Sequence, residues 1–117
     1  MFNQMDDTIL DYALFNINNI TSVVISDSVT SIGGYAFAYC SNLTNVTIGS
    51  DVTLIEPRVF YGSSNLTSLT FTPIGWWIST DNTANSGRSV PKSILSNASL
   101  VAKYLKSTSN SYYWNRS

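Results

Sequence analysis

A unit of 23 residues is repeated along residues 9–72, and this repeat restricts the possible folds more than any other feature of the sequence. Segments 19–41 and 42–64 are identical at nine of their 23 positions, a partial copy precedes them and the start of another follows. A unit this short cannot bury its apolar side alone, so neighbouring units must stack and share one core. Equivalent residues should then form columns, one of which contains Ile9, Ile32 and Ile55.

Each unit contains a short segment with the spacing L-x-x-L-x-L, which begins at residues 20, 43 and 66. This spacing, at a period of 23, falls within the range of leucine-rich repeats. Because alternate residues of a strand face opposite sides, the apolar residues of these segments should point inward and the intervening polar residues outward. We expect residues 32–37 to supply a second apolar layer on the opposite, convex side, and the asparagine that starts each unit to lie in a turn.

Residues 29–48, Val-Thr-Ser-Ile-Gly-Gly-Tyr-Ala-Phe-Ala-Tyr-Cys-Ser-Asn-Leu-Thr-Asn-Val-Thr-Ile, resemble the consensus of BspA-like leucine-rich repeats. The resemblance covers about residues 8–72, and the segment after them is similar to the C-terminal segment that closes some gut-bacterial members. Such repeats occur in bacterial surface proteins, in some protist proteins and in phage-encoded proteins. The resemblance implies a right-handed solenoid with a parallel β-sheet on one face and a role in binding, but no chemistry.

The predicted fold is therefore an α/β solenoid in one domain of 117 residues. We expect residues 1–18 to form an N-terminal partial repeat that acts as a cap, and residues 19–72 to form the leucine-rich repeats. Both open ends of such a stack must be covered. Residues 73–117 should form a C-terminal cap of short helices and aromatic residues, in which Asn97 is the N-cap of a helix.

Composition argues against an enzyme. The chain has no histidine, which removes histidine-based catalytic triads and the commonest metal ligand. Its single cysteine, Cys40, cannot form an internal disulfide and is better explained as a small buried residue than as a nucleophile. We expect no catalytic residue, no metal site and no cofactor.

Charge and hydropathy bear on partners and location. Only 11% of the residues are charged, and the chain has no basic block of the kind that binds nucleic acid and no apolar run long enough to span a membrane. The N-terminal residues lack the basic and apolar regions of a signal peptide. The sequence as written predicts a cytoplasmic protein; a fragment of a larger protein would instead belong to a cell surface or a virion.

Two surfaces are candidates for binding a protein partner. The first is the concave face of the predicted sheet, where parallel strands hold outward side chains at fixed spacing. Its residues are Ser22, Val24, Asn45, Thr47, Ser68 and Thr70. These small side chains would equally well do no more than solvate a parallel ladder, because binding hot spots favour Trp, Tyr and Arg.

The second candidate is a C-terminal patch that contains the residue types typical of binding hot spots. Its residues are Trp76, Trp77, Arg88, Tyr113 and Trp114. Trp76 and Trp77 are adjacent, so in an extended segment they point in opposite directions and one should lie near the surface beside Arg88. Capping the stack also needs large apolar side chains, so part of this set should serve only for packing.

Three functions fit these features. The chain is either a generic protein-binding module, a small phage-encoded inhibitor of a host or defence protein similar to an anti-CRISPR, or an assembly domain of a phage or cell-surface fibre. Residues 1–72 carry six carboxylates and one arginine, whereas residues 73–117 carry five basic side chains and one aspartate. Such a dipolar molecule is also suited to end-to-end contacts between copies of itself.

Overall fold

The structure is a computed structural model that describes residues 8–71, 76–79, 88–90, 95–106 and 113–115. Residues 80–89, which the polar sequence from Thr80 to Ser89 predicts to be a loop, lie outside these residues except for the last two. No described helix has both the length and the apolar character needed to cross a membrane.

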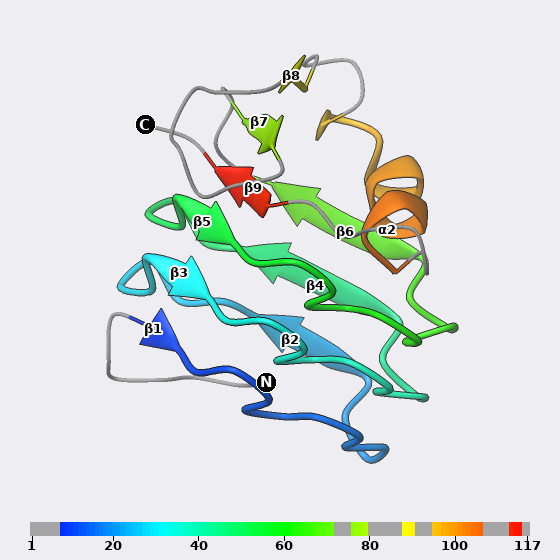
Figure 1. Cartoon of the computed structure of the whole chain (residues 1–117). Helices are drawn as coiled ribbons and strands as arrows, with labels where there is room; N and C mark the ends of the chain where they lie inside the picture. Colours follow the sequence, from blue (N-terminus) through cyan, green and yellow to red (C-terminus); the bar gives the residue numbers. More distant parts are fainter. Residues whose placement is uncertain (1–7, 72–75, 80–87, 91–94, 107–112, 116–117) are drawn as a thin grey trace.

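Strands from successive units alternate between two parallel ladders (Figure 1). The strands of the first ladder are β1 (Thr8–Ile9), β3 (Ser31–Ile32) and β5 (Leu54–Ile55). Those of the second are β2 (Ser22–Val24), β4 (Asn45–Ile48) and β6 (Ser68–Phe71). Every pair in both ladders joins residues 23 positions apart, so the register that the repeat predicted is confirmed.

The core lies between the two ladders and is built from columns of equivalent residues. Ile9 pairs with Ile32 and Ile32 with Ile55, and all three are fully buried. The predicted column is therefore present. Phe37 and Phe60 form another, with stacked rings whose centroids are 5.6 Å apart.

The parallel sheet was predicted on one face only, and this is incomplete because the second apolar layer also contains strands. Its strands have two residues each, which is too short for an alternating pattern to be visible in the sequence. Beyond β5, this sheet continues with the antiparallel strands β9 (Tyr113–Asn115), β7 (Trp77–Ser79) and β8 (Arg88–Ser89). Pairing of β9 with β5 joins segments about sixty residues apart in the sequence, for which no local pattern exists.

Helix α2 (Ala98–Lys106) packs against β6 at the same end of the molecule (Figure 1). The Asn97 side chain accepts a hydrogen bond of 3.1 Å from the backbone N–H of Leu100, which confirms Asn97 as the N-cap. At the other end of the helix, Nζ of Lys106 donates hydrogen bonds to the carbonyl oxygens of Ser64 and Leu66.

Polar side chains bind adjacent units together outside the core. The predicted turn position of the asparagines is confirmed at Asn42 and Asn65, whose amide nitrogens donate to the carbonyl oxygens of Asn18 and Ser41. Oδ1 of Asp27 likewise accepts the N–H of Ser50, 23 residues further on, and this hydrogen bond lowers the pKa of the Asp27 carboxyl. Each unit therefore satisfies backbone groups of its neighbour.

Candidate binding surface

The structure brings together the six residues predicted for the sheet face. They form two columns on the outer face of the β2–β4–β6 sheet, Ser22–Asn45–Ser68 and Val24–Thr47–Thr70. All six are exposed or half-buried. The face is therefore accessible, but it has no aromatic or charged side chain that would anchor a partner strongly.

The prediction that Trp76 and Trp114 belong to a contact surface is wrong. Trp76 is fully buried and Trp114 is 2% exposed, because both rings pack on Phe71 at the end of β6, with centroids 5.1 and 5.9 Å from its ring. The two rings cover the end of the repeat core. Burying their apolar area there stabilises the fold, whereas leaving it in contact with water would not. Tyr113 is half-buried. The side chains of Trp77 and Arg88 lie outside the part of the structure that is described.

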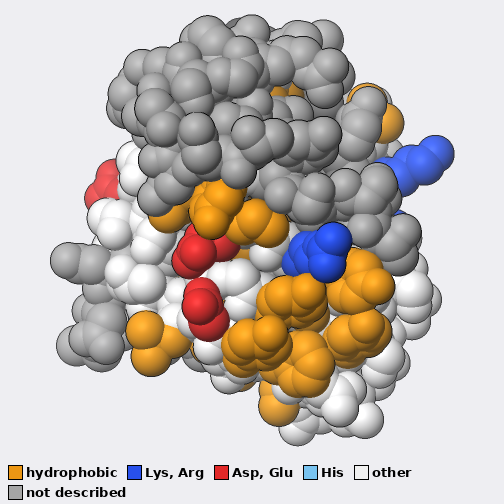
Figure 2. All heavy atoms as spheres, viewed as in Figure 1, with side chains coloured by type: hydrophobic (Ala, Val, Ile, Leu, Met, Phe, Trp, Pro, Cys, Tyr) orange, Lys and Arg blue, Asp and Glu red, His pale blue; other side chains and the backbone are white. Residues whose placement is uncertain are grey.

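A different set of large side chains lies on the turns that follow β1, β3 and β5, where three of them are exposed and three are half-buried (Figure 2). We call this set the aromatic patch. Its residues are Tyr12, Phe15, Tyr35, Arg58, Tyr39 and Tyr61. Tyr12, Tyr39 and Phe15 are 55%, 42% and 38% exposed, which is unusual for aromatic residues in contact with one another.

The backbone of the aromatic patch adopts a conformation that favours glycine. Tyr12, Tyr35 and Arg58, which are equivalent residues of three successive turns, have φ values of 60°, 59° and 62°. Tyr39 has a φ of 56°, and the equivalent residue of the next turn is Gly62. A left-handed conformation costs a residue with a side chain about 1–2 kcal/mol, which glycine avoids. These positions therefore carry large side chains at the expense of stability.

Ring-to-ring contacts hold the patch in one arrangement. The rings of Tyr12 and Tyr35 are parallel, with centroids 5.1 Å apart. Tyr39 meets Phe15 and Tyr61 edge to face, at centroid distances of 5.6 and 5.4 Å. Such pairs contribute about 0.5–1.5 kcal/mol each beyond the area they bury, which offsets part of the backbone cost.

Arg58 places one positive charge within the aromatic patch. Its Nη1 donates a hydrogen bond of 3.3 Å to the hydroxyl oxygen of Tyr35, and its guanidinium carbon lies 5.7 Å from the ring centroid of Tyr61. The guanidinium is thus within the distance range of a cation–π contact. The charge is held in place by the aromatic residues around it.

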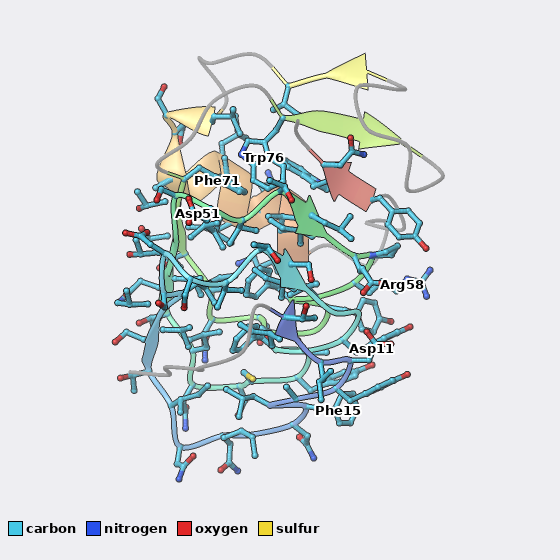
Figure 3. All side chains as sticks on the ribbon, turned by 90° about the vertical axis from the view of Figure 1, so that its left-hand side faces the viewer. Asp11, Phe15, Asp51, Arg58, Phe71 and Trp76 are labelled. Carbon is cyan, nitrogen blue, oxygen red and sulfur yellow. The ribbon has the colours of Figure 1, made fainter. Side chains whose placement is uncertain are left out.

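Acidic side chains lie at the edge of the aromatic patch (Figure 2). One is Asp11, which directly precedes Tyr12 (Figure 3), and the other is Glu56, which interacts with Asp11. Oδ1 of Asp11 accepts a hydrogen bond of 2.9 Å from the backbone N–H of Gly34, which fixes the side chain. Partial burial, the adjacent charge of Asp11 and a hydrogen bond between the two side chains raise the pKa of Glu56 above its ordinary value. The two acidic side chains therefore lie close together, and the charge of Asp11 disfavours ionisation of Glu56.

Neither a metal site nor a reactive thiol accompanies this surface in the described part of the chain. There, no group of three His, Cys, Asp or Glu side chains is arranged to hold a metal ion. Cys40 is fully buried as predicted, its Sγ donates to the carbonyl oxygen of Leu14, and burial raises the pKa of its thiol. A thiol held protonated in this way is a poor nucleophile.

Sequence analysis missed the aromatic patch because turn residues have no periodicity that tells inside from outside. Phe37 and Phe60 are buried in the core, whereas Tyr35 and Tyr61, close to them in the sequence, are half-buried and belong to the aromatic patch. The usable signal was the repeat itself. Tyr12 and Tyr35 are 23 residues apart, as are Tyr35 and Arg58, so they had to form one column.

Parallel ladders with a 23-residue register and short apolar strands define a leucine-rich repeat protein. A family model described as "BspA type Leucine rich repeat region (6 copies)" matches residues 7–79, and the chain therefore belongs to this family. No curated protein and no solved structure matches it. Leucine-rich repeat domains generally mediate protein–protein interaction, and the family is typically non-enzymatic.

Proposed function

We propose that this chain is a non-enzymatic protein-binding module and that it contacts its partner through the aromatic patch. The observation that carries the proposal is the combination of exposure and backbone cost at Tyr12 and Tyr39, which stand in left-handed turn positions where glycine would be more stable. Stability alone does not account for large exposed rings at such positions, and strain of this kind concentrates at functional sites.

Residue chemistry supports the same surface. Tyrosine and arginine are among the residues that dominate binding energy at protein interfaces, and the aromatic patch consists almost entirely of them. Rings fixed by their neighbours lose little conformational freedom when a partner binds, so less of the contact energy is spent on ordering side chains. The outer face of the β2–β4–β6 sheet is the competing surface, with smaller and uncharged side chains.

The proposal includes a right-handed repeat stack closed at its C-terminal end by α2 and β9, and a cytoplasmic location for the chain as written. An inhibitor of a host or defence protein and an assembly domain are two more specific forms of the same binding function. The identity of the partner distinguishes them: a host enzyme or defence protein supports the first, and a fibre or tail component the second.

The test is a pull-down from the native host with matched variants of the two surfaces. Tyr12→Asn and Tyr39→Asn combined remove two rings while keeping residues that tolerate a left-handed backbone, as Asn16 does at a φ of 59°. The control combines Asn45→Ala and Thr70→Ala on the sheet face. We expect the patch variant to weaken partner retention by at least about tenfold, since hot-spot truncation costs about 2 kcal/mol or more, and the control to retain it.

Cooperative thermal unfolding of both variants, followed by circular dichroism, ensures that loss of binding is not loss of fold. If the sheet-face variant loses the partner while the patch variant keeps it, the binding surface is the β2–β4–β6 face and the proposal fails.

A further inference from the structure

Two acidic side chains, Asp11 and Glu56, accompany the aromatic patch. Arg58 is the only basic side chain within residues 8–71. Asp11 directly precedes Tyr12 and lies against Gly33, and Glu56, which is 23 residues after Gly33, interacts with Asp11. In the described part of the chain, neither of them forms an ion pair with a lysine or an arginine. Two neighbouring carboxylates without a cation are stabilised when a positive charge is brought to them.

The aromatic patch already contacts one cationic group, the guanidinium of Arg58. Arg58 already occupies one ring, that of Tyr61, and hydrogen-bonds to Tyr35. Tyr12, at the N-terminal end of its column, is the most exposed ring of the set and follows Asp11 directly in the sequence. A guanidinium or ammonium group that contacts this ring would therefore lie next to a carboxylate, the combination in which cation–π contacts and ion pairs reinforce each other.

We propose that the partner presents to the aromatic patch a segment with arginine or lysine side chains, whose cationic groups contact the rings of Tyr12 and Tyr39 and pair with Asp11 and Glu56. This inference rests on the proposed function and names the chemistry of the partner. A purely apolar partner would bury both carboxylates without compensation. An acidic partner or a nucleic acid would face two like charges, while the single arginine of the patch is already engaged.

The test uses a defined probe rather than a cellular extract. A fluorescein-labelled Gly-Ser peptide with several arginines is titrated against the full chain and followed by fluorescence anisotropy and by the aromatic NMR signals of Tyr12 and Tyr39. The matched control peptide has citrulline, which has nearly the same shape without the charge, at every arginine. We expect the arginine peptide to bind about tenfold or more tightly than the citrulline peptide, the magnitude of one desolvated cation–π contact combined with an ion pair.

Variants locate the effect. Asp11→Asn keeps the oxygen that accepts the Gly34 N–H and removes only the charge, and Glu56→Gln does the same at its position. Each variant should lower the affinity for the arginine peptide by about three- to tenfold. Asp51→Asn is the matched control, because it removes the same charge on the opposite side of the molecule from Asp11 and Arg58 (Figure 3); it should leave the affinity unchanged.

Three outcomes overturn the inference. The first is that the citrulline peptide binds as tightly as the arginine peptide. The second is that Asp51→Asn lowers the affinity as much as Asp11→Asn does. The third is that a neutral oligosaccharide, but not the arginine peptide, changes the chemical shifts of the Tyr12 and Tyr39 rings. In each case the proposed function survives if the pull-down still depends on Tyr12 and Tyr39. If the pull-down does not depend on these residues, the proposed function fails independently of the peptide result.

Discussion

At the scale of single residues, the repeat uses one turn position in two ways. Tyr39 and Gly62 are equivalent and both have a positive φ, but only Gly62 lacks a side chain. A methyl group at Gly62 would come within 2.6 Å of Cδ1 in the Tyr39 ring, well inside van der Waals contact. The absence of a side chain in one unit therefore provides the space for an exposed ring of the unit before it.

This predicts that Gly62→Ala lowers the free energy of unfolding by about 1–3 kcal/mol, because it adds left-handed strain to a steric clash. Gly34→Ala is the matched control: its methyl group would meet only the carbonyl oxygen of Pro57, at 3.4 Å, and its φ is not in the left-handed region. We expect a change within about 1 kcal/mol for this variant. Urea unfolding gives the free energy of unfolding of both variants. Equal values would show that Tyr39 does not lie against Gly62.

At the scale of elements, α2 is attached to the repeats by its apolar face and by one lysine. Val101, Ala102 and Leu105 are fully buried, which accounts for the packing of the helix against β6. Lys106 then binds two carbonyl oxygens of the last turn before β6, at 3.2 Å for Ser64 and 2.8 Å for Leu66. These hydrogen bonds join the end of the helix to a turn about forty residues away in the sequence.

We therefore expect Lys106→Met, which keeps the apolar stem of the side chain, to lower the free energy of unfolding by about 1–2 kcal/mol through loss of these hydrogen bonds. Lys103→Met removes an equal charge from the same last turn of the helix, but Lys103 is exposed and should contribute within about 0.5 kcal/mol. Chemical denaturation of the two variants compares them directly. A Lys103 variant as unstable as the Lys106 variant would assign the effect to the helix dipole instead.

At the scale of the whole molecule, the two ladders end differently at the C-terminal side. β9 pairs with the edge of β5, and α2 packs against β6, so backbone groups and apolar residues are covered by different elements. Trp114 and Trp76 fill the space above Phe71 between them. Residues distant in the sequence thus complete a core that the repeats leave open.

Deletion of residues 91–117 should therefore abolish soluble, cooperative folding, because it removes both α2 and β9 and exposes the last apolar layer to water. Solubility on expression and the thermal unfolding of the purified chain provide the measurement. A truncated chain that remains soluble and melts cooperatively would show that these residues are an appendage rather than a cap.

Whether a feature could be predicted from the sequence depends on how far apart in the sequence its interacting residues lie. The columns of the core could be predicted, because a fixed period places Ile9, Ile32 and Ile55 in the same environment wherever the units stack. The burial of Trp76 could not, because it depends on a contact with Phe71 and on β9, far along the chain. The outward direction of Tyr35 was equally hidden, since the conformation of a single turn residue decides it.

The fixed register has a consequence for how such a protein evolves. Hydrogen bonds from Asn42 and Asn65 connect each unit only to the one before it, so a gene duplication of one complete unit would find matching acceptors at both of its boundaries. An insertion of another length within one of the strands would break the register in which equivalent side chains pair. Duplication would also add a row of turn residues to the exposed rings, so a lineage can lengthen its recognition surface without altering the architecture that supports it.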